Sequence, residues 1–145
     1  MLKGIDPLIG PDLIHALAQM GHGDEIVIAD ANFPSYALAR KTVYGSALTI
    51  GCDAVTALRA ILSLFPLDEF EPDAVMTMQV VNDPEAVPPV VAEAAPILDA
   101  AGHQPKPLER FAFYERAARA FAVVHTLEGR SYGNFILRKG VVFTS

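Results

Sequence analysis

The sequence has few cysteines, no long apolar run and no secretory signal, which are the features of secreted and membrane proteins. Its 145 residues include one cysteine, and 19% of them are charged. No apolar run approaches the ~18 to 20 residues that a membrane-spanning helix needs. The N-terminal residues lack the charged and apolar segments of a secretory signal. We therefore expect a cytoplasmic protein with no disulfide and no association with a membrane.

Motifs for nucleotides, nucleic acids and metals are also missing. The chain holds neither a G-x-G-x-x-G fingerprint nor a G-x-x-x-x-G-K-[ST] loop. A formal net charge of −6, without a run of Lys or Arg, argues against nucleic acid as a partner. His22, Asp24 and Glu25 are close in sequence, but no HxH or HxxxH spacing accompanies them, and a zinc site usually gathers three protein ligands. We expect no metal and no cofactor.

What the chain does have is an apolar composition and a length that suits one domain. A domain over residues 1–145 should bury about two thirds of the surface of its unfolded chain around one core. Its hydrophobic fraction of 52% is high for a small monomer, so part of the apolar surface should lie at contacts between identical subunits. The sequence thus predicts a homo-oligomer that binds a small molecule.

Helix and strand signals alternate along the chain. Gly21 is expected to end the first helix as a left-handed cap, and Pro96 to limit or kink a helix within the proline-rich segment 82–107. The predicted helices cover 11–20, 53–65 and 111–120, and the predicted strands cover 25–29, 74–81, 121–126 and 133–138. The last two strands are expected to pair as an antiparallel hairpin. These elements predict an α/β domain with a mixed sheet covered by helices.

His22 is the strongest candidate for chemistry. It stands between Gly21 and Gly23, whose backbones can adopt conformations closed to other residues and leave the imidazole accessible. An accessible imidazole is a natural proton carrier at neutral pH. Asp30, at the far end of the next strand, offers an acceptor where α/β proteins often place ligand groups, although an acid there also caps turns.

A second group of candidates lies in the C-terminal third. Arg110 stands where a loop enters a helix, and its alternative is ordinary surface charge. Tyr132 and Asn134 project to the same side at the spacing of a strand, with Gly133 between them. A phenol and a carboxamide so placed suit sugar hydroxyls, but they also suit a turn.

The remaining histidines and the cysteine favour structural roles. A nucleophilic role for Cys52 is weak, because Asp53 beside it opposes thiolate formation. Three other histidines are expected to have no role in a site, because they lie in a helix pattern, in a Gly/Pro-rich loop and in a strand: His15, His103 and His125.

Together, these motifs resemble a known family. The segments Gly21–Ile26, Ala29–Ala31, Arg110–Ala117 and Tyr132–Asn134, in this order, are similar to the L-fucose mutarotase / D-ribose pyranase (RbsD/FucU) family over essentially the whole chain. The Arg-Phe-Ala-Phe-Tyr-Glu-Arg stretch places the chain nearer to the fucose branch. The chain departs from the fucose branch at two places. The proline-rich segment 82–107 does not resemble that branch closely, and Asn32 stands where the branch carries histidine.

The resemblance implies a fold, an activity and a site. It implies an RbsD-like domain that interconverts the α and β anomers of L-fucose or a related monosaccharide without a cofactor. His22 would be the general acid, and the sugar would be bound by Asp30, Arg110, Tyr132, Gly133 and Asn134. Family members are cytoplasmic and form ring-shaped decamers. A non-catalytic sugar-binding component of a transporter and a D-ribose pyranase remain alternatives.

The spacing of His22 and Asp30 predicts a site completed by subunit contact. An unbroken strand would separate these residues by roughly 26 Å, since each residue advances the chain by ~3.3 Å, and no monosaccharide spans that distance. Either the ends of the strand fold back sharply, or neighbouring protomers bring the two residues together.

Overall fold

One mixed sheet forms the centre of the molecule. The computed structural model describes residues 1–145, and its six strands lie in the order β2-β5-β1-β6-β3-β4. Strand β6 runs antiparallel to its neighbours β1 and β3, whereas the other pairs are parallel. The strands are β1 (Glu25–Ala29), β2 (Leu48–Thr49), β3 (Val75–Met78), β4 (Lys106–Leu108), β5 (Ala122–His125) and β6 (Phe135–Arg138). This arrangement confirms the expected mixed sheet.

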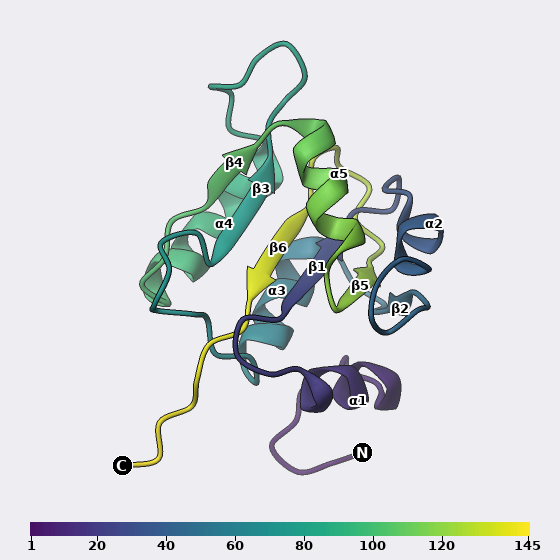
Figure 1. Cartoon of the computed structure of the whole chain (residues 1–145), viewed down its shortest axis with the longest axis vertical. Helices are drawn as coiled ribbons and strands as arrows, with labels where there is room; N and C mark the ends of the chain where they lie inside the picture. Colours follow the sequence, from purple (N-terminus) through teal and green to yellow (C-terminus); the bar gives the residue numbers. More distant parts are fainter.

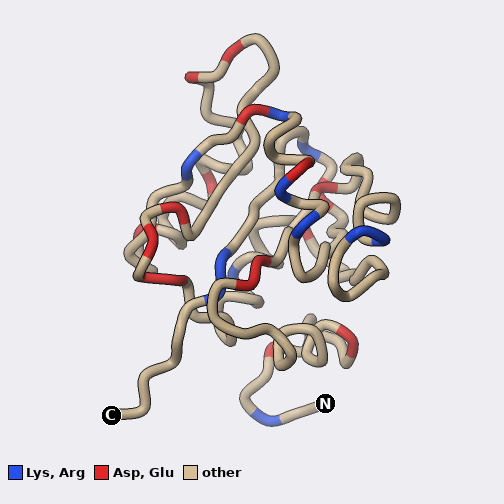
Figure 2. Tube along the Cα trace, viewed as in Figure 1, with Lys and Arg blue, Asp and Glu red and all other residues tan.

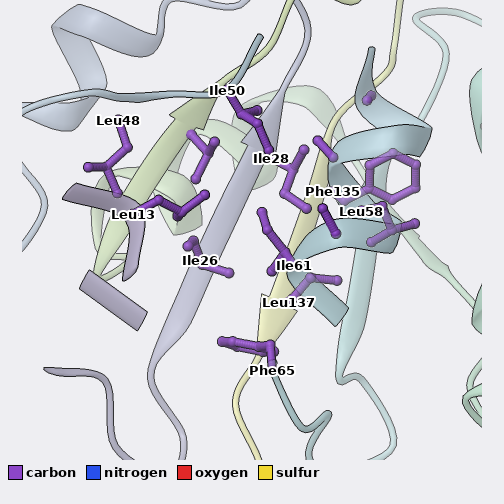
Figure 3. Close-up of a cluster of buried hydrophobic side chains, with 14 of the residues drawn as sticks. Leu13, Ile26, Ile28, Leu48, Ile50, Leu58, Ile61, Phe65, Phe135 and Leu137 are labelled. Carbon is purple, nitrogen blue, oxygen red and sulfur yellow. The ribbon is translucent and has the colours of Figure 1, made fainter. Parts of the chain in front are cut away.

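Helices cover both faces of this sheet (Figure 1). One face packs against α1 (Pro11–Gln19), α3 (Ala54–Leu62) and α4 (Pro89–Ala100), and the other against α2 (Ser35–Ala39) and α5 (Arg110–Ala118). Alternate strand residues serve the two faces, as the period of two requires. In β1, Ile26 and Ile28 join the larger core, which Figure 3 shows in close-up, while Val27 joins the smaller one.

Local chemistry explains where two of the helices begin. Pro11 stands at the start of α1, where its missing N–H has no partner to lose. Asp53 caps α3, since its Oδ1 accepts from the backbone N–H of Thr56 at 2.8 Å. Both features agree with the sequence-based prediction. None of the helices is long and apolar enough to cross a membrane.

The predicted hairpin between the last two strands is wrong. Strand β1 lies between β5 and β6 and pairs with both, parallel to β5 and antiparallel to β6. Because β1 is apolar on both faces, it takes a central position in the sheet. The connection from β5 to β6 crosses the carboxyl end of β1, where the carbonyl of Glu128 accepts from the N–H of Ala31 at 2.8 Å.

The predicted cap at Gly21 is absent, and of the two effects predicted for Pro96 the structure contradicts the first, that it limits its helix. Gly21 does not end α1 with a left-handed cap; the helix ends at Gln19, followed by an extended Met20, and the positive φ of 88° occurs at Gly23. Pro96 does not end α4, which runs through it to Ala100. The carbonyl of Ala92, which a proline at 96 leaves without its helical donor, belongs to an exposed residue. The sequence-based assignment missed the short elements α2, β2 and β4.

Candidate active site

Asp30 anchors a polar cluster at the carboxyl end of β1. Its side chain is buried, with Oδ1 accepting from the N–H of Asn32 at 3.0 Å and Oδ2 accepting from the N–H of Gly133 at 3.2 Å. Asn134 completes the cluster by accepting from the N–H of Asp30 at 2.9 Å and donating to Oδ2 of Asp30 at 3.1 Å. Asp30 therefore closes a turn and also fixes the loop that leads into β6.

The loop is held close to the sheet at Gly133. A Cβ atom at this position would lie 2.8 Å from Cγ of Glu128, which is closer than real contacts allow. Glu128 is buried and bound by Arg130, whose guanidinium holds the pKa of this carboxylate below its usual value. Tyr132 has a φ of 62°, in the left-handed region that L-residues rarely adopt. Strained backbone of this kind clusters at functional sites.

Arg110 lies at the first position of α5. Glu109 caps this helix, since its Oε2 accepts from the N–H groups of Phe111 and Ala112, and these bonds lower the pKa of Glu109. The guanidinium of Arg110 stacks over the ring of Phe111 at 4.6 Å and forms no ion pair. Its Nε is buried without a hydrogen-bond partner. A buried donor without a partner is rare, so this group is suited to a polar ligand.

A pocket of about 230 Å³ lies beside Arg110. Its walls come from the loop after β3 and from the start of α5: Gln79, Val80, Val81, Asn82, Pro84, Glu109 and Arg110. The hydroxyl of Tyr132 accepts from the N–H of Val81 at 3.1 Å and so ties the two loops together. Strands β1 and β3 both run antiparallel to β6, so the carboxyl ends of β1 and β3 and the start of β6 lie at the same edge of the sheet. Asp30 and the 132–134 segment are therefore at this edge, next to the long loop between β3 and α4 and the start of α5 (Figure 1).

His22 stands at the opposite edge, on a well-anchored loop. Gly21 donates to Oδ2 of Asp24 at 2.7 Å, and Gly23 donates to the carbonyl of Lys139 at 2.9 Å. Lys139 in turn donates from Nζ to the carbonyl of Met20 at 2.6 Å. The side chain of His22 is 48% exposed. The accessible imidazole predicted from the flanking glycines is therefore present.

A buried carboxylate that the sequence did not flag lies beneath His22. Asp68 places Oδ1 at 3.2 Å from Nε2 of the imidazole, and the same oxygen accepts from the N–H of Phe70 at 3.1 Å. The Phe70 N–H is the main reason, and His22 a further one, that the pKa of Asp68 lies below its usual value. The ring of Phe70 packs against the imidazole, with 5.2 Å between centroids. Asp68 follows His22 by 46 positions in the sequence, so only the fold brings them together.

Within one chain, His22 and the Asp30 cluster do not meet. They flank the two ends of β1, an unbroken strand, and Asp30 is turned toward Gly133 and Asn134. This geometry contradicts the alternative in which the ends of the strand fold back to join the two residues. His22 has Asp68 and Phe70 as its neighbours instead.

The other chemical candidates have identifiable structural partners. Burial, with Asp53 and Asp6 as further causes, raises the pKa of the Cys52 thiol, which packs against the larger core. Asp24 caps the His22 loop and Glu25 pairs with Arg116, and no three His, Cys, Asp or Glu side chains gather as metal ligands. His125, expected to be structural, makes a 2.8 Å hydrogen bond between Nδ1 and Oγ of Ser35.

Comparison with known proteins extends over nearly the whole chain. Residues 3–142 match the RbsD / FucU transport protein family. The fucose mutarotase of Danio rerio is 44% identical over 98% of this chain and 95% of its own length. The L-fucose mutarotase of Histophilus somni (strain 2336) is 43% identical, with 97% of each chain covered.

Solved structures agree with this assignment. The fucose mutarotase of Streptococcus pneumoniae, solved in complex with L-fucose, has a TM-score of 0.84 and 38% identity, covering 98% of this chain and all of its own. The RbsD protein of Bacillus subtilis, solved with D-ribose, shares the fold at a TM-score of 0.72 and 22% identity, covering 99% of this chain and 100% of its own. From its sequence and from its fold, the chain belongs to the RbsD / FucU transport protein family.

Proposed function

We propose that this chain is an L-fucose mutarotase, a cofactor-independent isomerase that interconverts the α and β anomers through the open-chain aldehyde. The observation that carries the proposal is the unpaired guanidinium of Arg110 beside a pocket whose wall is bound, through Val81, to Tyr132. Such a constellation offers hydrogen bonds to the hydroxyls of a neutral sugar. The mutarotases with 43% and 44% identity over nearly the whole chain support L-fucose as the substrate.

The chemistry needs one proton carrier and a set of groups that orient the sugar. A proton must reach the ring oxygen while the anomeric hydroxyl loses one, and the reverse step on the other face of the aldehyde completes the exchange. His22 is accessible and acts as the acid. Arg110, Tyr132, Gly133 and Asn134 bind the sugar. Asp30 contributes mainly by fixing the loop, because most of its acceptor capacity is already used.

Since the two edges of the sheet carry different parts of the machinery, the complete site is formed between protomers. His22 of one protomer faces the Asp30 cluster of the next, and closed symmetry repeats this arrangement around a ring. In this proposal, residues 1–145 form one mutarotase domain. The protein is cytoplasmic and assembles as a ring-shaped decamer. Exposed apolar side chains, Tyr36, Val43 and Phe111 among them, are available for such contacts.

Saturation-transfer NMR across a panel of monosaccharides tests the reaction. Irradiating one anomeric proton should reduce the signal of the other in proportion to catalysed exchange, and L-fucose should respond most strongly. A transport component that only binds sugar would hold one anomer without exchanging it. A D-ribose pyranase would accelerate the exchange of ribose rather than of fucose.

Subunit mixing tests the shared site. After reversible dissociation, inactive His22→Ala and inactive Asp30→Ala proteins should regain activity together, because some interfaces receive both intact groups. A verified mixed ring that stays inactive, or a dilute monomer with the full rate, would rule out the pairing across subunits.

A further inference from the structure

The connection between β5 and β6 contains a buried carboxylate that belongs neither to the sugar-binding set nor to the apolar core. The side chain of Glu128 is 4% exposed. A buried charge is costly unless it is paired and hydrogen-bonded, and both oxygens of Glu128 have donors. Oε1 accepts from Nη2 of Arg130 at 3.0 Å and from the N–H of Ala54, the first residue of α3, at 3.4 Å. Oε2 accepts from Nε of Arg130 at 3.1 Å and from its backbone N–H at 3.0 Å.

The backbone of Glu128 is fixed to the end of β1. Its carbonyl accepts from the N–H of Ala31 at 2.8 Å, and its own N–H donates to Oγ1 of Thr126 at 3.1 Å. Oγ1 of Thr126 in turn donates to the carbonyl of Ala29 at 2.8 Å. Glu128 therefore joins three parts of the fold: β1 through its backbone, α3 through Oε1, and the start of the loop before β6 through Arg130.

The sugar-binding loop rests on the aliphatic part of Glu128. A Cβ atom at Gly133 would lie 2.8 Å from Cγ of Glu128, so the backbone of Gly133 lies directly against this side chain. Gly133 also donates its N–H to Oδ2 of Asp30 at 3.2 Å. Because Tyr132 and Asn134 flank Gly133, the position of the Glu128 side chain determines how deep their backbone lies.

The outer end of Arg130 contributes much less. Its Nη1 donates to Oε2 of Glu93, on α4, at 2.6 Å, but the two side chains are 43% and 50% exposed. Exposed ion pairs of this kind stabilise a protein little. The hydrogen bonds from Arg130 hold the pKa of Glu128 below its usual value, so this buried carboxylate is charged at neutral pH. Its need for a cation is therefore the strong part of the network.

We propose that Glu128, neutralised by Arg130, is a positioning residue of the mutarotase site: it holds the Tyr132–Asn134 segment at the depth at which its polar groups meet the sugar. This inference rests on the function proposed above, and it assigns a role to two residues that touch no substrate. Without Arg130, a buried carboxylate loses its cation and turns toward water. The support beneath Gly133 is then lost.

The first test follows the loop directly, by hydrogen–deuterium exchange and mass spectrometry of the intact assembly. Arg130→Met removes the charge and keeps an aliphatic stem. We expect amides in the segment 127–134 to exchange roughly tenfold faster in this variant, while those of β3 exchange as in the wild type.

Arg59→Met is the matched control, because Arg59 is exposed on α3 and forms no ion pair. It should exchange as the wild type does throughout. Wild-type protection of the segment 127–134 in Arg130→Met would overturn the inference. This measurement needs no sugar, so it stays informative even if L-fucose is not the substrate.

The second test separates KM from kcat for L-fucose exchange. The loop holds the sugar alike in the ground state and in the transition state, so its displacement should raise KM with little change in kcat. We expect KM to rise roughly tenfold in Arg130→Met, within the 10²-fold that a misplacement of about 1 Å can cost. Glu93→Gln should change KM by less than about twofold, because its ion pair is exposed. A merely structural role would reduce the amount of active protein and leave KM unchanged, and that result would contradict the proposal.

A rescue experiment identifies the unpaired charge as the cause. In Glu128→Gln/Arg130→Met, the neutral amide needs no cation, its oxygen can accept from the backbone N–H of residue 130, and its aliphatic part still supports Gly133. KM and the exchange of the segment 127–134 should therefore return toward wild-type values. A double variant as impaired as Arg130→Met would refute this cause. If the wild-type protein neither binds nor exchanges L-fucose, the proposed function fails, while deuterium exchange still tests whether Glu128 and Arg130 fix the loop.

Discussion

The pair formed by Asp30 and Asn134 gives the sharpest prediction about stability. Asn134→Ala removes two hydrogen bonds, of 2.9 and 3.1 Å, between buried groups. It leaves the N–H of Asp30 without an acceptor, which costs about 1 to 3 kcal/mol, and it deprives the carboxylate of one donor, while Gly133 still donates to the same oxygen. Together we expect a loss of about 2 to 4 kcal/mol in the free energy of unfolding.

Asn32→Ala is the matched control. Asn32 is exposed and contacts Asp30 only through its backbone N–H, so alanine there should change the free energy of unfolding by less than ~0.5 kcal/mol. Both variants are compared with the wild type by urea unfolding at one fixed protein concentration, because oligomer assembly makes stability depend on concentration. If Asn134→Ala costs no more than Asn32→Ala, the pair does not hold the loop.

Three further perturbations test other parts of the account. Arg110→Lys keeps the positive charge but loses the planar set of guanidinium donors, so calorimetry should show the affinity for L-fucose falling about tenfold, or ~1.4 kcal/mol. An unaltered affinity would show that Arg110 does not bind the sugar. Gly133→Ala should displace the loop, because its Cβ would lie 2.8 Å from Cγ of Glu128, and weaken sugar binding, whereas Gly129→Ala, with nothing within 4 Å, should not; equal affinities would refute the close approach. Arg138 lowers the pKa of Asp73 from 3.8 to about 2, so the stability from this carboxylate is present above pH ~4 and is lost as the pH falls toward 2. In Asp73→Asn, the urea midpoint of unfolding should therefore depend less on pH in that window than it does in the wild type. An equal dependence on pH in the two proteins would contradict this contribution of Asp73.

The sequence predicted those elements that local chemistry determines. The buried strand at 25–29 and the helix capped by Asp53 follow from apolar pattern and side-chain caps, and both are present. The pairing of strands was not predictable in this way. Whether β5 pairs with β6 or with β1 depends on which strand the whole sheet places at its centre, and the short distance in sequence between β5 and β6 gives no information about this.

The same contrast holds for the candidate site. Glycines around His22 predicted its exposure correctly, because they act within three residues of chain. Asp68 could not be found, since nothing near it in sequence marks it and only the folded chain places its carboxylate 3.2 Å from the imidazole. Because the sequence analysis paired the last two strands as a hairpin, it did not predict that Gly133 and Asn134 contact Asp30. The connection crosses the end of β1, and this crossing brings Gly133 and Asn134 to Asp30.

The most direct measurement is exchange between the two anomeric protons of L-fucose, followed by saturation transfer with wild-type and His22→Ala proteins at equal concentration. The account predicts that wild type accelerates the exchange well above the spontaneous rate and that folded His22→Ala, which loses little packing because this side chain is half exposed, does not. Wild-type exchange at the spontaneous rate, or full acceleration by a folded His22→Ala protein, would contradict it.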